Sequence, residues 1–106
     1  METMVLEHAV LPVRAGQQKA FEAAFAEAAP LIAASPGFLA LRLSRCVEDP
    51  DRYLLLVEWD TLADHVEGFR GSPAFERWRA LLHHFYDPPP TVEHFEEVRR
   101  VAPGPG

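Results

Sequence analysis

The chain has 106 residues, a size that predicts one domain with a core large enough to fold without disulfides or metals. Its composition, 48% hydrophobic and 25% charged, is ordinary for a soluble globular protein and argues against disorder. The net charge of −6 disfavours nucleic acid and anionic membrane surfaces as partners, because both attract basic proteins.

Two further features favour a cytoplasmic location. The single cysteine, Cys46, cannot form an internal disulfide, which suits a reducing compartment. The first residues, Met1 to Met4, carry an acid rather than the basic residues of a signal peptide, and no apolar run is long enough to cross a membrane. We therefore expect a cytoplasmic protein that makes no membrane contact.

The first half of the chain predicts a strand, a helix and a second strand. Both alternating sets of side chains over Met4–Val13 are largely apolar, which predicts a strand covered on both faces. Gln17–Ala34 has the period of an amphipathic helix, in which Pro30 should cause a kink or begin the last turn. After the stop signal Ser35-Pro36-Gly37, residues Phe38–Val47 alternate as a strand.

The second half repeats this order. A turn at residues 48–51 leads into a strand over Arg52–Asp60, which closes a hairpin. Thr61 and Asp64 resemble a capping box for a short helix over Leu62–Phe69, and Ser72-Pro73 is a favoured start for a helix ending at Phe85. Pro88 to Pro90 end that helix, and Thr91–Val98 reads as the last strand.

The order β-α-β-β-α-β predicts an α+β, ferredoxin-like antiparallel sheet with both helices on one face. We expect one domain over residues 1–100 and a flexible tail over residues 101–106, which lack core-forming content. The other face of the sheet also carries apolar residues in all four strands, more than a soluble monomer usually exposes. The strands therefore predict a homodimer that pairs through this face as a dimeric α+β barrel.

Several motifs carry a resemblance to a known family. They are Ser35-Pro36-Gly37-Phe38, Val57-Glu58-Trp59, His65 with Phe69, Ser72-Pro73-x-Phe75-x-x-Trp78, and Pro90-x-Val92-Glu93-His94-Phe95. From residue 4 to residue 98 the chain resembles the antibiotic biosynthesis monooxygenase domain family of dimeric α+β barrels. The resemblance implies a fold more firmly than a reaction. The family includes cofactor-independent oxygenases of polyketide anthrones and quinols, haem-degrading enzymes, and members without an assigned activity.

His65 is the candidate catalytic residue. In chains that resemble this one, a histidine in the short helix often lies near the pocket, where it can orient a phenol or quinol or accept its proton. Trp59, Phe69 and Tyr86 are candidate walls of a substrate pocket. The alternative for His65 is that it only packs against or caps its helix. The alternative for the three aromatic residues is that they only build the core.

The remaining candidates favour structural roles. His8, His94, Glu58 and Arg42 would form a buried polar network if they share one face of the sheet. His83 and His84 point about 100° apart and cannot face one ligand together, and one of them should lie at the solvent edge. No spacing of ligands predicts a metal site, and Cys46 reads as an inert side chain.

The resemblance can also be followed into the haem-degrading branch. Its members resemble one another in an asparagine on the first strand, a tryptophan in the short helix and a ligating histidine in the next helix. The corresponding positions here hold Ala9, Phe69 and Arg79, which disfavours haem degradation. A shift of the alignment would bring His83 or His84 closer to the ligand position.

The leading hypothesis is a cofactor-independent monooxygenase that acts with O2 on a small aromatic substrate: a phenol, a quinol or an anthrone-like compound. No cofactor and no metal are expected. One alternative is a non-enzymatic dimeric binding module for a small hydrophobic metabolite, since the fold alone does not imply chemistry. A haem-degrading oxygenase is a further alternative, as is an isomerase or dehydratase on the same scaffold.

Overall fold

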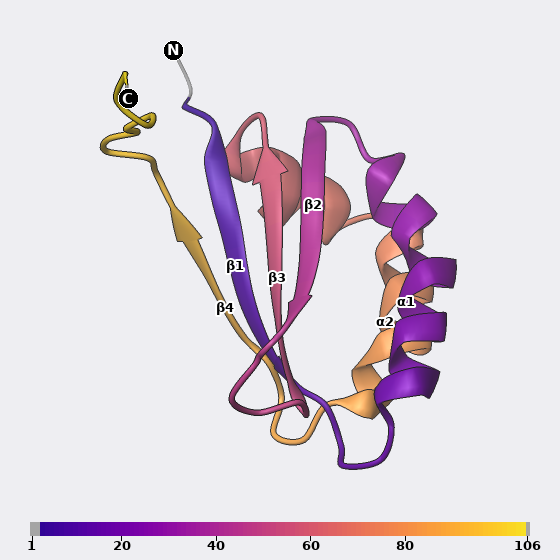
Figure 1. Cartoon of the computed structure of the whole chain (residues 1–106). Helices are drawn as coiled ribbons and strands as arrows, with labels where there is room; N and C mark the ends of the chain where they lie inside the picture. Colours follow the sequence, from indigo (N-terminus) through magenta and orange to yellow (C-terminus); the bar gives the residue numbers. More distant parts are fainter. Residues whose placement is uncertain (1–2, 106) are drawn as a thin grey trace.

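Four antiparallel strands form one curved sheet in the order β2-β3-β1-β4 (Figure 1). The computed structural model describes residues 3–105, in which the strands are β1 (Val5–Pro12), β2 (Phe38–Arg45), β3 (Arg52–Trp59) and β4 (Thr91–Phe95). Every neighbouring pair is antiparallel. This arrangement confirms the ferredoxin-like α+β fold expected from the order of elements.

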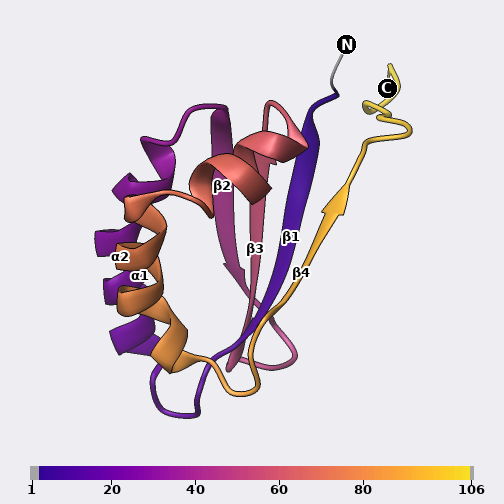
Figure 2. The same cartoon turned by 180° about the vertical axis from the view of Figure 1, so that it is seen from behind.

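Both long helices lie side by side on the same face of the sheet, as expected (Figures 1 and 2). They are α1 (Gln18–Ala33) and α2 (Pro73–Leu82), and two shorter turns accompany them: η1 (Asp64–Phe69) and η2 (His83–Phe85). In α1, Pro30 is exposed and begins the last turn, where its carbonyl accepts from the N–H of Ala34 at 3.2 Å. Ser72 caps α2 by accepting from the N–H of Phe75 at 3.3 Å.

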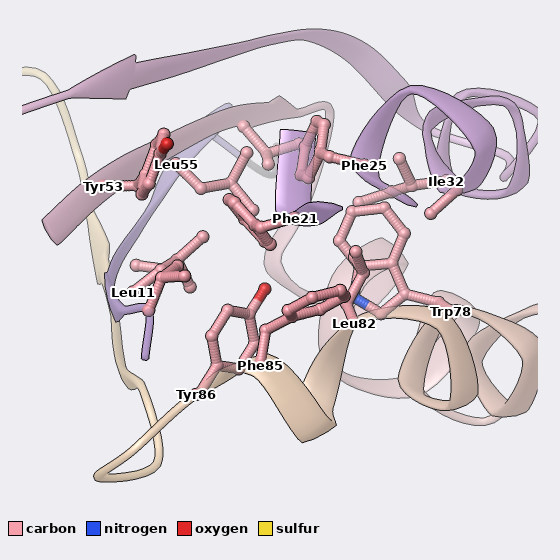
Figure 3. Close-up of a cluster of buried hydrophobic side chains, with 14 of the residues drawn as sticks. Leu11, Phe21, Phe25, Ile32, Tyr53, Leu55, Trp78, Leu82, Phe85 and Tyr86 are labelled. Atoms are coloured by element: carbon pink, nitrogen blue, oxygen red, sulfur yellow. The ribbon is translucent and has the colours of Figure 1, made fainter. Parts of the chain in front are cut away.

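The core fills the layer between the sheet and the helices (Figure 3). Alternate residues of β1 and β3 point into it, because successive side chains of a strand face opposite sides. Phe21 of α1 lies at its centre, with ring centroids 4.9 Å from Tyr53 and 5.7 Å from Phe85. This face carries the aromatic side chains that position the site described below.

The opposite face of the sheet has no helix over it (Figures 1 and 2). We call it the open face. Its side chains are half-buried on the two central strands, and Phe95 at the edge is 47% exposed. The central residues of the open face are Leu6, His8, Val10, Leu54, Leu56 and Glu58.

Two predicted elements differ from the structure. The last strand ends at Phe95 rather than Val98, because Phe95 pairs with Leu6 near the start of β1 and no strand lies beyond to continue the ladder. The short helix predicted over Leu62–Phe69 is mainly π-helical, with the N–H of Arg70 bonded to the carbonyl of His65 at 3.0 Å. The described residues from 96 onward form neither helix nor strand and are exposed.

Candidate active site

A cavity of about 80 Å³ lies between the sheet and the helices. The cavity is lined by inward-facing residues of β1 and β3, by the turn η1, and by α2 with η2. Most of its wall is apolar, and two buried polar side chains, Glu7 and His65, stand among the apolar ones. A mostly apolar cavity with a few placed polar groups is the usual form of a small-molecule site.

Glu7 is the centre of the polar part. It lies on β1, is 6% exposed and points toward the helices. Its Oε1 accepts the indole N–H of Trp59 at 3.0 Å and lies 3.2 Å from Nε2 of His65. The Trp59 and His65 rings stack with centroids 5.2 Å apart, so two ring N–H groups can reach one carboxyl oxygen.

His94 extends this group toward the edge of the sheet. Its Nε2 lies 2.7 Å from Nδ1 of His65. The pairing of β4 with β1 places His94 directly opposite Glu7, so both side chains share the helix-facing side. Glu7, His65 and His94 therefore form a continuous series of polar contacts that runs from the cavity wall to the half-buried edge strand.

Burial shifts the proton affinities of these groups in opposite directions. Desolvation raises the pKa of the Glu7 carboxyl, against the Trp59 hydrogen bond and the Arg70 charge, which lower it. Desolvation lowers the pKa of His65 to about 3, and the charges of Arg70 and His94 act in the same direction. The pKa of His94 is also lowered, first by burial and then by Arg70. His65 is consequently neutral near pH 7.

The turn η1 holds both His65 and Phe69 buried. A capping box fixes its start, and both bonds of the box are present. The N–H of Thr61 donates to Asp64 Oδ2 at 3.2 Å, and the N–H of Asp64 donates to Thr61 Oγ1 at 3.1 Å. Gly37 makes room for this box, because a Cβ there would lie 2.1 Å from Asp64 Oδ2.

Aromatic side chains form the rest of the wall. Phe69 meets Phe75 and Trp78 edge to face, with ring centroids 5.4 and 5.7 Å apart. Tyr86 closes the opposite side, and Figure 3 shows its hydroxyl directed into the layer between sheet and helices. No group of residues 3–105 hydrogen-bonds this hydroxyl, and burial raises the pKa of the Tyr86 phenol. Of the three predicted walls, Phe69 and Tyr86 line the cavity, whereas Trp59 lies behind His65.

The expected network of His8, His94, Glu58 and Arg42 does not form. His94 faces the helices, whereas the other three residues lie on the open face, where His8 contacts Phe95 with ring centroids 5.4 Å apart. The two histidines occupy neighbouring strands but differ by one residue in register, and one residue reverses the face.

Sequence reasoning missed Glu7 and did not place His83 in the cavity. Glu7 is the single charged residue in the inward set Val5, Glu7, Ala9, Leu11 and Val13, and that is the signal that could have found it. His83 lines the cavity while its neighbour His84 is exposed, so the expected divergence of this pair is correct. Within residues 3–105, no three acidic, histidine or cysteine side chains are grouped to hold a metal ion. No described helix is long and apolar enough to span a membrane.

Comparisons with known proteins agree with this architecture. The uncharacterized protein YczJ of Bacillus subtilis is 54% identical over 95 residues, which cover 90% of this chain and all of that protein. A solved structure from Bordetella bronchiseptica, named as a candidate antibiotic biosynthesis monooxygenase, shares 37% identity. It has a TM-score of 0.88, with 92% of this chain and 100% of that chain covered.

A second solved structure shares the fold at lower identity. SnoaB of Streptomyces nogalater, a cofactor-independent oxygenase, is 23% identical with a TM-score of 0.73, covering 94% of this chain and 96% of its own. The sequence model of the family described as antibiotic biosynthesis monooxygenase matches residues 4–81. The chain therefore belongs to the antibiotic biosynthesis monooxygenase family.

Proposed function

We propose that the protein is a cofactor-independent oxygenase that acts on a small phenol or quinol. The observation that carries the proposal is the buried Glu7–His65 pair in the wall of an aromatic cavity. A carboxyl and an imidazole in such a place can take part in removing a phenolic proton, and aromatic walls can stack on the ring. The fold shared with SnoaB, a cofactor-independent oxygenase, supports the reaction class.

The proposed reaction needs only the substrate, O2 and a base. Removal of the phenolic proton leaves an electron-rich phenolate, whose ring carbon donates electrons to O2 and forms a C–O bond. The resulting hydroperoxide loses water and leaves a quinone. One oxygen atom of O2 thus enters the product and the other leaves as water, while the ring is oxidised. The protein supplies proton removal, orientation and a dry site.

The volume of the cavity favours substrates with one ring. Its 80 Å³ is about half of the ~150 Å³ apolar cavity that binds benzene in an engineered protein. A one-ring phenol therefore enters only if the wall moves outward, where Phe75 is half-buried and Arg70 is exposed. An anthrone has three fused rings and would need a much larger rearrangement.

The residues take the following parts in this proposal. His65 acts as the base or as the group that orients it, and Phe69 and Tyr86 hold the ring between them. Trp59 supports His65 from behind. Arg70 forms no ion pair with another residue of the described chain, so its charge is available to stabilise a phenolate.

We also infer that two copies pair through the open face. That face carries apolar side chains on β1 and β3 with no helix over them, and pairing would bury these side chains. The edge residue Phe95, 47% exposed, would be covered as well. The resulting assembly is the dimeric α+β barrel expected from the sequence.

Oxygen uptake over a panel of aromatic compounds tests the proposed activity. The panel contains phenol, resorcinol, hydroquinone, a naphthol and an anthrone, and mass spectrometry with isotopically labelled O2 follows the oxygen atom. We expect uptake with one-ring compounds, one labelled atom in the product and slower turnover by His65→Ala. Unchanged turnover by His65→Ala would remove His65 from the mechanism. Binding without uptake would indicate a binding module for a small hydrophobic metabolite, and conversion without O2 would indicate an isomerase or dehydratase.

A further inference from the structure

We propose that Glu7, rather than His65, is the group that accepts the proton of the substrate, and that His65 and His94 are positioning residues that orient it. This inference rests on the proposed oxygenase function and deepens it. The substrate class that it implies is a neutral phenol or resorcinol that becomes ionised inside the cavity. Three features of the site carry the argument: the occupied ring of His65, the free oxygen of Glu7 and the charge of Arg70.

Both ring nitrogens of His65 are already engaged. Nδ1 lies 2.7 Å from Nε2 of His94, and Nε2 lies 3.2 Å from Oε1 of Glu7. A neutral imidazole has one N–H and one lone pair, and these two contacts use both. His65 could accept a proton from a substrate only by breaking one of them. Its side chain is 4% exposed, so the cost of an uncompensated buried group would be high.

The hydrogen-bond directions follow from the carboxylate. Ionised Glu7 can only accept, so we infer that Nε2 of His65 carries its hydrogen toward the carboxylate and that Nδ1 carries the lone pair. His94 must then donate its Nε2–H to Nδ1 of His65. The contact between the two histidines fixes the tautomer of His65, in the way that a second group commonly fixes a functional histidine. His65 and His94 thus hold the carboxylate rather than compete with it for a proton.

Glu7 has one oxygen left for the substrate. Oε1 accepts from Trp59 and lies 3.2 Å from Nε2 of His65, whereas no hydrogen bond found within residues 3–105 involves Oε2. Every fully enclosed side-chain nitrogen or oxygen in the described chain has a partner, so Oε2 must touch open space. Glu7 lines the cavity, and Oε2 is therefore the basic atom that a bound phenol can reach.

The charges around Glu7 suit this role. Burial makes the carboxyl a stronger base than an exposed glutamate, while the Trp59 hydrogen bond and the Arg70 charge keep it able to ionise. The groups that face it are Trp59 from β3, His65 from η1, His94 from β4 and Arg70 after η1. His83 lines the cavity from the end of α2. Arg70 is the one full positive charge among them and can stabilise the phenolate once the proton has moved.

The step balances without any other reactant. The O–H bond of the phenol breaks, its proton bonds to Oε2 of Glu7, and the electron pair stays on the phenolate oxygen. O2, the oxidant of the proposed function, reacts only afterwards. The hydroxyl of Tyr86, which also lines the cavity, is a second group that could donate to that oxygen.

Two assays on one set of variants test this inference. The first is oxygen uptake with resorcinol against pH. The second is anaerobic exchange of the ring hydrogens of resorcinol for deuterium, followed by proton NMR, which requires deprotonation but no O2. The variants are Glu7→Gln, His65→Ala, His65→Gln and, as a matched acid-to-amide control, Glu67→Gln on the exposed side of η1. Circular dichroism and thermal melts establish that each variant is folded.

We expect Glu7→Gln to lower both rates by about 100-fold or more at every pH, the usual scale for losing a general base. His65→Ala should move the acidic limb of the pH profile to higher pH, because the carboxylate loses a donor. In His65→Gln the acidic limb should return to its wild-type pH. The glutamine amide can donate a hydrogen bond to the carboxylate again, but it cannot accept a proton at neutral pH. Glu67→Gln should match the wild type.

The two assays distinguish failure of the Glu7 assignment from failure of the oxygenase proposal. If Glu7→Gln keeps its exchange rate within a few-fold, or if His65→Gln is as inactive as Glu7→Gln, Glu7 is not the base. If the wild type exchanges ring hydrogens in a Glu7-dependent way but takes up no O2, the oxygenase proposal fails and the assignment of Glu7 stands. If the folded wild type neither exchanges hydrogens nor takes up O2, both are overturned.

Discussion

The imidazole of His65 lies almost parallel to the indole of Trp59, with planes 16° apart, and both rings address the same oxygen of Glu7. The stack is formed by residues from β3 and η1 that meet a carboxyl on β1. It places a buried acid beside the indole N–H of Trp59 and Nε2 of His65, next to a small aromatic cavity. Most of the chemistry proposed for this protein depends on that arrangement.

Trp59→Phe tests the contribution of the indole donor. The change keeps an aromatic ring but leaves Glu7 with one donor fewer, so the pKa of the carboxyl should rise further. Loss of a hydrogen bond to a buried carboxyl should cost about 1–3 kcal/mol in addition to the smaller ring. Urea unfolding measures the stability, and carbon-13 NMR of the Glu7 carboxyl measures its titration.

Trp78→Phe is the control for this experiment. Trp78 is also buried and also loses ring volume, but the indole that hydrogen-bonds Glu7 is that of Trp59. The pKa of the Glu7 carboxyl should therefore rise in Trp59→Phe and stay at its wild-type value in Trp78→Phe. Equal behaviour of the two variants would show that the indole N–H does not hold Glu7.

His65 should make the fold sensitive to acid. Its pKa falls from 6.5 to about 3 on folding, so between these values the unfolded chain binds the proton more tightly and stability rises with pH. The slope approaches about 1.4 kcal/mol per pH unit. Glu7 opposes this above pH 4.5, because its raised pKa makes the folded state bind a proton more tightly. His65→Gln should therefore lose less stability than the wild type as the pH falls from 6.5 toward 3.

Unfolding by urea at a series of pH values measures this difference. His84→Gln serves as the control, because His84 is exposed at the end of α2. A wild-type curve that runs parallel to that of His65→Gln over the whole range would contradict the burial of a neutral His65.

Gly37→Ala should damage the entry to η1. Gly37 has φ +84°, where a side chain is strained, and the added Cβ would lie 2.1 Å from Oδ2 of Asp64. Strain of this kind costs about 1–3 kcal/mol, and displacement of the capping box adds to it. Gly16→Ala is the matched control, because Gly16 has φ +80° with no atom within 4 Å of the added Cβ. Chemical denaturation should show a clearly larger loss for Gly37→Ala, and equal losses would contradict the role given to Asp64.

Leu56→Asp tests the pairing of two copies. Leu56 lies on the open face between His8 and Arg42, so a buried carboxylate there should disrupt the interface. We expect sedimentation velocity at micromolar concentration to show a dimer for the wild type and a monomer for Leu56→Asp. Leu62→Asp, at a residue that is 45% exposed outside the strands, should leave the dimer intact. A wild-type chain that sediments as a monomer would refute the pairing.

Phe75→Ala should change which ligands fit. Phe75 is half-buried in the cavity wall, and its truncation should open room for a second ring. Binding measured by tryptophan fluorescence should shift in favour of naphthol over phenol in this variant. Leu62→Ala should leave the ratio of the two affinities unchanged. An unaltered ratio in Phe75→Ala would show that this wall does not limit the size of the ligand.

Much of the fold follows from local sequence patterns. The alternation along Val5–Pro12 and Arg52–Trp59, the Thr61–Asp64 capping box and the Ser72 cap are all present as expected. They can be predicted because each involves residues within a few positions of one another, so that period and capping chemistry are visible in the sequence. The inward direction of His65 and Phe69 follows from the same kind of spacing.

Only the tertiary structure decided which polar groups meet. His94 joins Glu7 and His65, rather than His8, because β4 pairs with β1 in the register that sets His94 opposite Glu7. That pairing joins strands about eighty residues apart in the chain, and a register change of one residue would have reversed the face. The sequence by itself determined the elements and their buried sides, because these depend on local periodicity. The contacts of the Glu7 carboxyl with Trp59 and His65, and the volume left beside it, arose from long-range packing, which no local pattern contains.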